Sequence, residues 1–245
     1  MTVLFDDAIL HSDNHLLAVN KPAGMPSQPD ASGDVSLVEA GKEYVKVRFG
    51  KPGNVYLALL HRLDRPTSGL CLLARTDKAA GRMADAFRRR EVGKTYWAMV
   101  ECLNDPGVGR ELRDYLVPLA NGGMRRSADK TDAGKEARLA YKTLATAANG
   151  RRALLEIHLE TGVKHQIRCQ LAGLGLPIVG DFRYGPEGRP ARPDPVANGR
   201  AILLHARRLA FMHPVRREQM TICAPLPGHW TESLKAFPEN AVPKD

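Results

Sequence analysis

The sequence predicts an α+β fold, with a large mixed, mainly antiparallel sheet flanked by short helices. Strand-like segments come first and recur along the chain with short helical segments between them, an order typical of α+β domains. The clearest pair is 137–146 and 152–161, joined by Asn-Gly at 149–150, which is a strong hairpin signal. A chain of 245 residues with a hydrophobic share of 43% can bury a sizeable core. We expect one domain over 1–230 and a tail over 231–245.

The first half of the chain combines short strands with two amphipathic helices. One helix is expected over 36–49, where apolar residues recur at helical spacing and Asp34 or Ser36 can cap the first turn. The other can be capped by Thr76 or Asp77 and ends near Arg90, where three arginines complement the helix dipole. The expected strands of this half are 3–5, 8–11, 15–19, 55–60, 70–74 and 94–101.

The second half adds two loops, a helix and the last strands. Residues 104–134 and 183–200 are rich in Gly, Pro, Asn, Asp and Arg, and we interpret both as loops, the first a mobile basic excursion. A helix is expected over 166–174, because apolar residues share one face and Gly and Pro follow. The last strands are expected at 201–211 and 219–223.

A net charge of +9 favours a polyanionic partner. Nucleic acid is the first candidate, because neutralising phosphates supplies most non-specific affinity. A membrane surface would call for a basic amphipathic helix with large apolar residues opposite, and the sequence offers none. There is also no signal segment and no apolar stretch of membrane-spanning length. We expect a cytoplasmic protein that binds no membrane.

Neither metal nor cofactor is expected. The sequence has no phosphate-binding Gly-rich loop and no dinucleotide fingerprint. The cysteines are far apart without a Cys-x-x-Cys pair, and each lies in an apolar run, so we expect small buried side chains and no zinc site. They are Cys71, Cys102, Cys169 and Cys223.

The segment His-Arg-Leu-Asp-Arg-Pro-Thr-Ser-Gly at 61–69 is the strongest candidate for chemistry. Apolar segments on both sides predict strands that hold this loop between them. Arg62 and Arg65 flank Asp64 and favour its ionised form, which suits a nucleophile or an ion-pair anchor better than a general acid. The alternative is a purely structural turn, a common use of Asp near Pro and Gly. Spacing alone leaves both interpretations open.

Residues 61–69 resemble the signature of the RluA-type RNA pseudouridine synthases, in which the Asp is catalytic. The resemblance extends over roughly residues 3–228. Further blocks in the family's order are 20–24, 94–98, 161–168, 171–172, 177–181, 204–206 and 211–214. The resemblance implies a curved sheet whose cleft carries the Asp. It also implies an isomerisation of uridine to pseudouridine that needs no metal or cofactor. It implies ribosomal or transfer RNA as the partner, and we expect a monomer.

The resemblance also implies roles for three residues. Asp64 would be the nucleophile or charge-stabilising carboxylate, and Tyr96 would stack on the target uracil and move a proton through its hydroxyl. Arg168 lies at the border of a buried helix face, where it could pair with Asp64 and hold it ionised. The alternatives are a Tyr96 that packs in the core and an Arg168 that extends to solvent. Some relatives carry a small N-terminal RNA-binding domain, and the roughly twenty residues before Lys21 predict none here.

Three further residues are candidates for substrate binding. A uridine within a helix or stacked loop must be flipped out, at a cost of a few kcal/mol. Arg62 could fill the vacated stack, and Lys164 and His165, before a helix, could bind backbone phosphate. The family usually has Arg where this chain has Val163, and Val-His where it has Cys-Gln at 169–170, so RNA contacts there can differ.

Two other classes of function compete. A non-catalytic RNA-binding or ribosome-assembly factor could keep the fold, although it would not need Asp64, Tyr96 and Arg168 together. A hydrolase with Asp64 as nucleophile usually needs a second carboxylate as acid, and the sequence places no clear one near Asp64.

Overall fold

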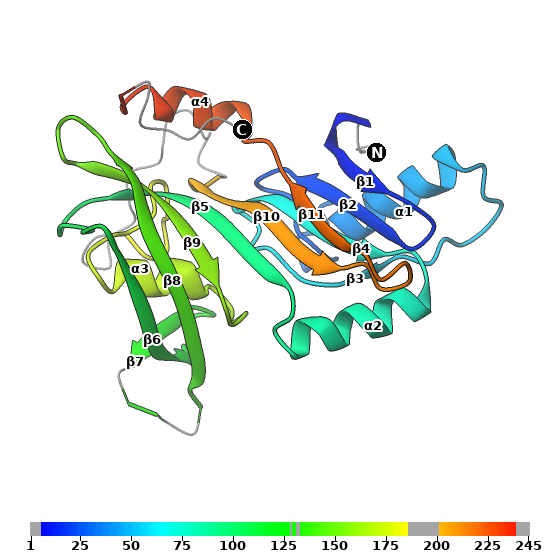
Figure 1. The fold of residues 1–245 in the computed structure, drawn as a ribbon, viewed down its shortest axis with the longest axis horizontal. Coiled ribbons are helices and arrows are strands. Elements are labelled where there is room, and N and C mark those ends of the chain that lie inside the picture. The colour runs from blue at the N-terminus through cyan, green and yellow to red at the C-terminus, as the bar shows by residue number, and fades with distance from the viewer. Residues whose placement is uncertain (1–5, 128, 131–132, 186–200, 239–245) are drawn as a thin grey trace. The chain divides into compact units, whose positions relative to one another are not determined.

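The computed structural model describes residues 6–127, 129–130, 133–185 and 201–238. Within it the chain forms two compact units (Figure 1). The first unit contains residues 1–93 and 206–225, and the second contains 94–205 and 226–245. The expected strand at 3–5 and most of the expected loop at 183–200 lie outside the described residues.

The first unit is built on antiparallel strands near their predicted positions. The pairing order is β1-β2-β4-β10-β11, and β3 also pairs with β4. The expected turn at 13–14 is present, since Asp13 N donates to Leu16 O at 3.0 Å. The strands are β1 (Ile9–Ser12), β2 (Leu16–Lys21), β3 (Ala58–Leu59), β4 (Ser68–Ala74), β10 (Leu204–Met212) and β11 (Gln219–Cys223).

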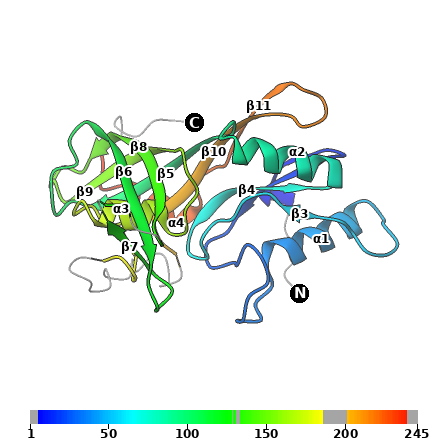
Figure 2. The same ribbon diagram turned by 90° about the horizontal axis from the view of Figure 1, so that it is seen from below.

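Two capped helices cover opposite faces of this sheet (Figure 2). In α1 (Leu37–Arg48), Ser36 forms a capping box with Glu39, which confirms one of the two predicted caps. In α2 (Asp77–Arg88), Thr76 accepts from Ala79 N as predicted. A short 3-10 helix, η1 (Asp6–Ala8), precedes β1.

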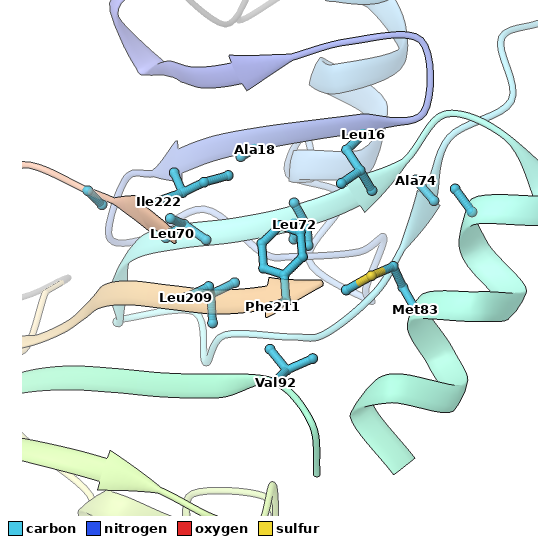
Figure 3. Close-up of a cluster of buried hydrophobic side chains, with 12 residues drawn as sticks. Leu16, Ala18, Leu70, Leu72, Ala74, Met83, Val92, Leu209, Phe211 and Ile222 are labelled. Carbon is cyan, nitrogen blue, oxygen red and sulfur yellow. The ribbon is translucent and has the colours of Figure 1, made fainter. Parts of the chain in front are cut away.

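One hydrophobic cluster of the first unit lies between α2 and the sheet (Figure 3). Met83 reaches from α2 toward Phe211, and every second residue of β2, β4 and β10 points to the same side. Each buried Leu, Met or Phe contributes about 1.5–3 kcal/mol through removal from water. The cluster contains Leu16, Ala18, Leu70, Leu72, Ala74, Ala79, Met83, Val92, Leu209, Phe211, Ile222 and Ala224.

The strands of the second unit pair antiparallel in the order β5-β9-β8-β6-β7. The helix α3 (Gln166–Ala172) packs against β6 and β7. The predicted strand at 94–101, the hairpin and this helix are all found within two or three residues of the expected bounds. The strands are β5 (Gly93–Glu101), β6 (Gly109–Pro118), β7 (Met124–Ser127), β8 (Lys135–Thr146) and β9 (Arg152–Leu159).

One prediction for the second unit is wrong. The segment 104–134 is not a loop excursion, because it contains β6 and β7. The sequence also did not indicate α4 (Gly228–Leu234), which buries Trp230 and is followed by the buried Phe237. In both places charged or polar residues dominate the sequence while a few apolar side chains anchor the element.

The cysteine prediction is right for two of four residues. Cys71 and Cys169 are buried, but Cys102 is half-buried and Cys223 is exposed at the end of β11. In the part of the chain that the structure describes, no group of three or more His, Cys, Asp or Glu side chains could hold a metal ion. No helix there is long and apolar enough to cross a membrane.

Candidate active site

The Asp64 loop is the connection between β3 and β4, as the flanking apolar segments predicted. At its start, the ring nitrogen Nε2 of His61 accepts from Leu72 N at 3.1 Å. Leu63 is buried, Asp64 is half-buried, and Thr67 N donates to Asp64 O at 3.0 Å. The backbone of Asp64 therefore closes the turn at the centre of the loop.

A second loop braces the Asp64 loop from within the same unit. Gly24 N donates to Arg65 O at 2.8 Å, and Arg65 Nε donates back to Gly24 O at 3.0 Å. The Ser27 hydroxyl donates to Leu63 O at 2.8 Å and accepts from Leu63 N at 3.1 Å. These four bonds hold the backbone on both sides of Asp64, so two blocks forty residues apart act as one rigid support.

Lys21, at the end of β2, is a functional candidate that the sequence reasoning did not single out. Its side chain is 0% exposed, and burial lowers the pKa of Lys21 to about 8 while the charge of Asp64 acts in the opposite direction. At neutral pH most molecules still carry the ammonium group. Its acceptors are the carbonyl oxygens of Pro22 at 2.9 Å, Met25 at 2.9 Å and Arg65 at 3.3 Å.

Gly69 lets β4 approach β10 closely. Its φ is +114°, a conformation that favours glycine. A Cβ atom at this position would lie 2.4 Å from the carbonyl oxygen of Ala206. The glycine that ends the 61–69 signature is therefore required by backbone packing in the first unit.

The two arginines that flank Asp64 differ in environment. Arg62 is exposed. Arg65 pairs with Asp34 and lies 3.7 Å from the carboxylate of Asp30, two partners that the sequence did not predict. Its guanidinium is therefore shared with other carboxylates, so the charge near Asp64 is smaller than the sequence alone indicates.

Tyr96 and Arg168 belong to the second unit. Tyr96 lies in β5, opposite Ile157 of β9, and its side chain is buried. Arg168 lies in α3 and is 6% exposed, so the alternative of an arginine that extends to solvent is wrong. Its Nε donates to Asp181 Oδ2 at 2.6 Å and its Nη2 to Asp181 Oδ1 at 2.9 Å. Asp181 is the last residue of the 177–181 block, but the sequence did not predict its pairing with Arg168.

Lys164 and His165 do lie directly before α3. Lys164 is exposed, and His165 has a φ of +55° and is half-buried. The ring nitrogen Nδ1 of His165 lies 2.8 Å from the hydroxyl of Tyr184. Of the predicted residues, the structure places Arg62 and Asp64 in the first unit and the other four in the second.

One departure from the family pattern, Gln170, has a structural role. Gln170 is buried, and its amide donates to Asp114 Oδ2 at 2.8 Å and accepts from Gln166 Nε2 at 3.1 Å. Gln166 in turn accepts from the Thr161 hydroxyl at 2.8 Å. This chain of polar side chains ties α3 to β6 beneath the helix.

Comparisons with known proteins agree with the arrangement. A family model described as RNA pseudouridylate synthase matches residues 15–173. The mitochondrial pseudouridylate synthase RPUSD4 of Xenopus tropicalis is 32% identical, over 93% of this chain and 79% of the relative. The ribosomal large subunit pseudouridine synthase C of Buchnera aphidicola is 31% identical, over 92% and 69%. The tRNA pseudouridine synthase C of Pasteurella multocida is 30% identical, over 94% and 95%.

A solved structure confirms the predicted fold class. Human RNA Pseudouridylate Synthase Domain Containing 4 matches with a TM-score of 0.77 and 28% identity, over 94% of this chain and 92% of the other. The shared architecture is an α+β fold with a large, mostly antiparallel sheet.

Proposed function

Since the chain belongs to the RNA pseudouridylate synthase family and is therefore an isomerase, we propose that it converts specific uridines of structured ribosomal or transfer RNA to pseudouridine. Relatives named for each of these RNA classes are about equally similar to it. The reaction breaks the bond between ribose and N1 of uracil, rotates the base and forms a bond through C5. No atom is gained or lost, so no redox cofactor is called for.

The observation that carries the proposal is the braced loop that presents Asp64. The carboxylate is half-buried on a turn whose backbone is held by four hydrogen bonds from the 24–27 segment. Such preorganisation suits a group that must meet a reacting atom in one orientation. We assign Asp64 as the nucleophile or charge-stabilising carboxylate. Lys21 is buried in the same unit, and the charge of Asp64 acts to raise the pKa of its ammonium group.

The other two assigned residues would act on the base and on Asp64. Tyr96 has an aromatic face for the uracil and a hydroxyl that can relay a proton. Arg168 would pair with Asp64 through a charge-assisted hydrogen bond, which is about twice as strong as a neutral one.

RNA binding is assigned to exposed basic residues near these groups. Arg62 follows His61 at the start of the Asp64 loop and is exposed, so it can enter a base stack or contact phosphate. Lys164 and His165 come just before α3 and are assigned to backbone contacts. The expectation of a cytoplasmic location stays a prediction, because a frog relative is named as mitochondrial.

The test is a pseudouridine map of total RNA by carbodiimide-dependent sequencing, in cells with and without the gene. We expect one or a few sites to disappear without the gene and to return with the wild type but not with Asp64→Asn. The purified Asp64→Asn protein should bind the mapped RNA with unchanged affinity. A map that is identical in both strains would contradict the proposed substrates. Restored sites with Asp64→Asn would contradict the role of the carboxylate.

A further inference from the structure

Two residues of the turn that follows α3, Asp181 and Tyr184, contact Arg168. Asp181 is 0% exposed and accepts two bonds from the guanidinium. Its Oδ1 also accepts from Arg183 N at 3.0 Å and Tyr184 N at 3.2 Å. The carboxylate therefore receives four hydrogen bonds, and both its position and the conformation of the turn are fixed together.

Tyr184 holds Arg168 from a second direction. The Arg168 Cζ atom lies 5.2 Å from the centre of the Tyr184 ring, a cation–π distance. The Tyr184 hydroxyl accepts from Met124 N at 2.8 Å. Burial raises the pKa of Tyr184 to about 12, so the hydroxyl keeps its proton at neutral pH. The same hydroxyl forms a hydrogen bond of 2.8 Å with Nδ1 of His165. The ring is thereby anchored to β7 and to the residue before α3.

We propose that Asp181 and Tyr184 are positioning residues for pseudouridine formation, and that they act by fixing the guanidinium plane of Arg168. A guanidinium has five N–H donors in a rigid fork. Asp181 accepts hydrogen bonds from Nε and Nη2 of Arg168. This ion pair and the Tyr184 ring beneath the guanidinium therefore set the direction in which Nη1 points. The proposal rests on the proposed role of Arg168 in the reaction.

The expected kinetic effect is on turnover and not on RNA binding. Asp181→Asn keeps the size of the side chain but removes the charge, so Arg168 can tilt. A displacement of about 1 Å in a reacting group costs about 100-fold in rate. We expect Asp181→Asn to lower kcat by about that factor with little change in KM for RNA. Tyr184→Phe keeps the ring and loses only the hydroxyl anchor, so its kcat should lie between those of Asp181→Asn and wild type.

The experiment measures tritium release from ribosomal and transfer RNA transcripts made with 5-tritiated uridine, since the reaction displaces the hydrogen on C5. Binding of the same transcripts is measured in parallel. Asp13→Asn is the matched control, because Asp13 also pairs with an arginine, Arg216, but this pair lies in the first unit and does not include Arg168. The control should lower stability and leave kcat unchanged.

A double-mutant cycle separates positioning from general damage. If Asp181 acts through Arg168, adding Asp181→Asn to Arg168→Lys should lower kcat no further. Multiplying losses would overturn the inference, as would wild-type kcat in both single variants. If Asp181→Asn does not fold, the same cycle with Tyr184→Phe in place of Asp181→Asn tests the inference. Wild-type protein that releases no tritium from any transcript would contradict the proposed function instead.

Discussion

At the scale of single residues, the structure holds a buried hydroxyl in the Asp64 loop. Thr67 is 2% exposed, and its Oγ1 has no hydrogen-bond partner among the residues that the structure describes. A buried polar atom without a partner costs about 1–3 kcal/mol. The backbone of the same residue is nevertheless used, since its N–H closes the turn on Asp64.

Thr67→Val should therefore stabilise the protein. Valine keeps the branched shape and removes the unpaired hydroxyl, so we expect the free energy of unfolding to rise by about 1 kcal/mol in a urea titration. Thr76→Val is the matched control with the opposite sign, because that hydroxyl caps α2 and its loss costs about 1 kcal/mol. A loss of stability in Thr67→Val would mean that an ordered water satisfies the hydroxyl.

Residue positions were easier to predict than residue partners. Asp64, Tyr96 and Arg168 lie on the predicted loop, strand and helix. The partner of Arg168 was missed because Asp181 is thirteen residues away across an irregular turn, where no periodicity links the two. Lys21 was missed because its acceptors are backbone carbonyls, which carry no sequence signal.

At the scale of elements, caps were predictable and a strand with a buried polar residue was not. Ser36 and Thr76 begin their helices as expected, since capping depends on residues within one turn. In β6 the buried positions are Leu112, Asp114 and Leu116. A carboxylate in the middle of the buried face breaks the apolar alternation from which a strand is recognised. Its burial depends on Arg126, 2.9 Å away, and on Gln170, neither of which is local in sequence.

Gln170→Ala should accordingly loosen α3 from β6. The substitution removes a partner of the buried Asp114 carboxylate and a partner of Gln166. We expect a loss of about 1–3 kcal/mol in the free energy of unfolding, measured by urea denaturation. Gln219→Ala in the exposed edge of β11 is the control and should change little. Equal stabilities of the two variants would show that the polar chain beneath α3 contributes nothing.

At the scale of the whole molecule, the sequence predicted most elements but not how the chain is divided between two compact units. The segment 206–225 completes the first unit, although more than a hundred residues of the second unit precede it. Pairing of this kind depends on contacts between distant segments, and local patterns carry no record of them. The apolar alternation of β10 predicts a strand without naming its neighbours.

One side chain joins the two ends of the first unit. Asp13, in the turn after β1, accepts from His11, from His213 and from Arg216, each at 3.0 Å. His213 and Arg216 follow β10, about two hundred residues later in the chain. Burial raises the pKa of Asp13, but hydrogen bonds from His11 and from the backbone of His15 and Leu16 outweigh it and hold the pKa well below its usual range.

Because the folded state lowers this pKa, the ionised carboxylate contributes stability above the unfolded value of about 3.9, and the contribution is lost as the pH falls below it. Asp13→Asn should therefore be less stable than wild type near neutral pH, by a difference of the order of 1 kcal/mol, since a partly exposed group is screened by solvent. The difference should shrink as the pH falls below about 4 in a series of urea titrations.

The exposed Asp7 supplies the control, and Asp7→Asn should follow the wild-type curve at every pH. A difference between wild type and Asp13→Asn that stays constant down to the acid limit would mean that the shape of the side chain matters and not its charge. A difference that disappears with acid would show that one carboxylate fastens the C-terminal hairpin of β10 and β11 to the N-terminal hairpin of β1 and β2. The C-terminal hairpin includes β10. Gly69, at the end of the Asp64 loop, lets β4 approach β10 closely. Loss of the Asp13 contacts would then weaken the first unit while leaving the four bonds around Asp64 in place.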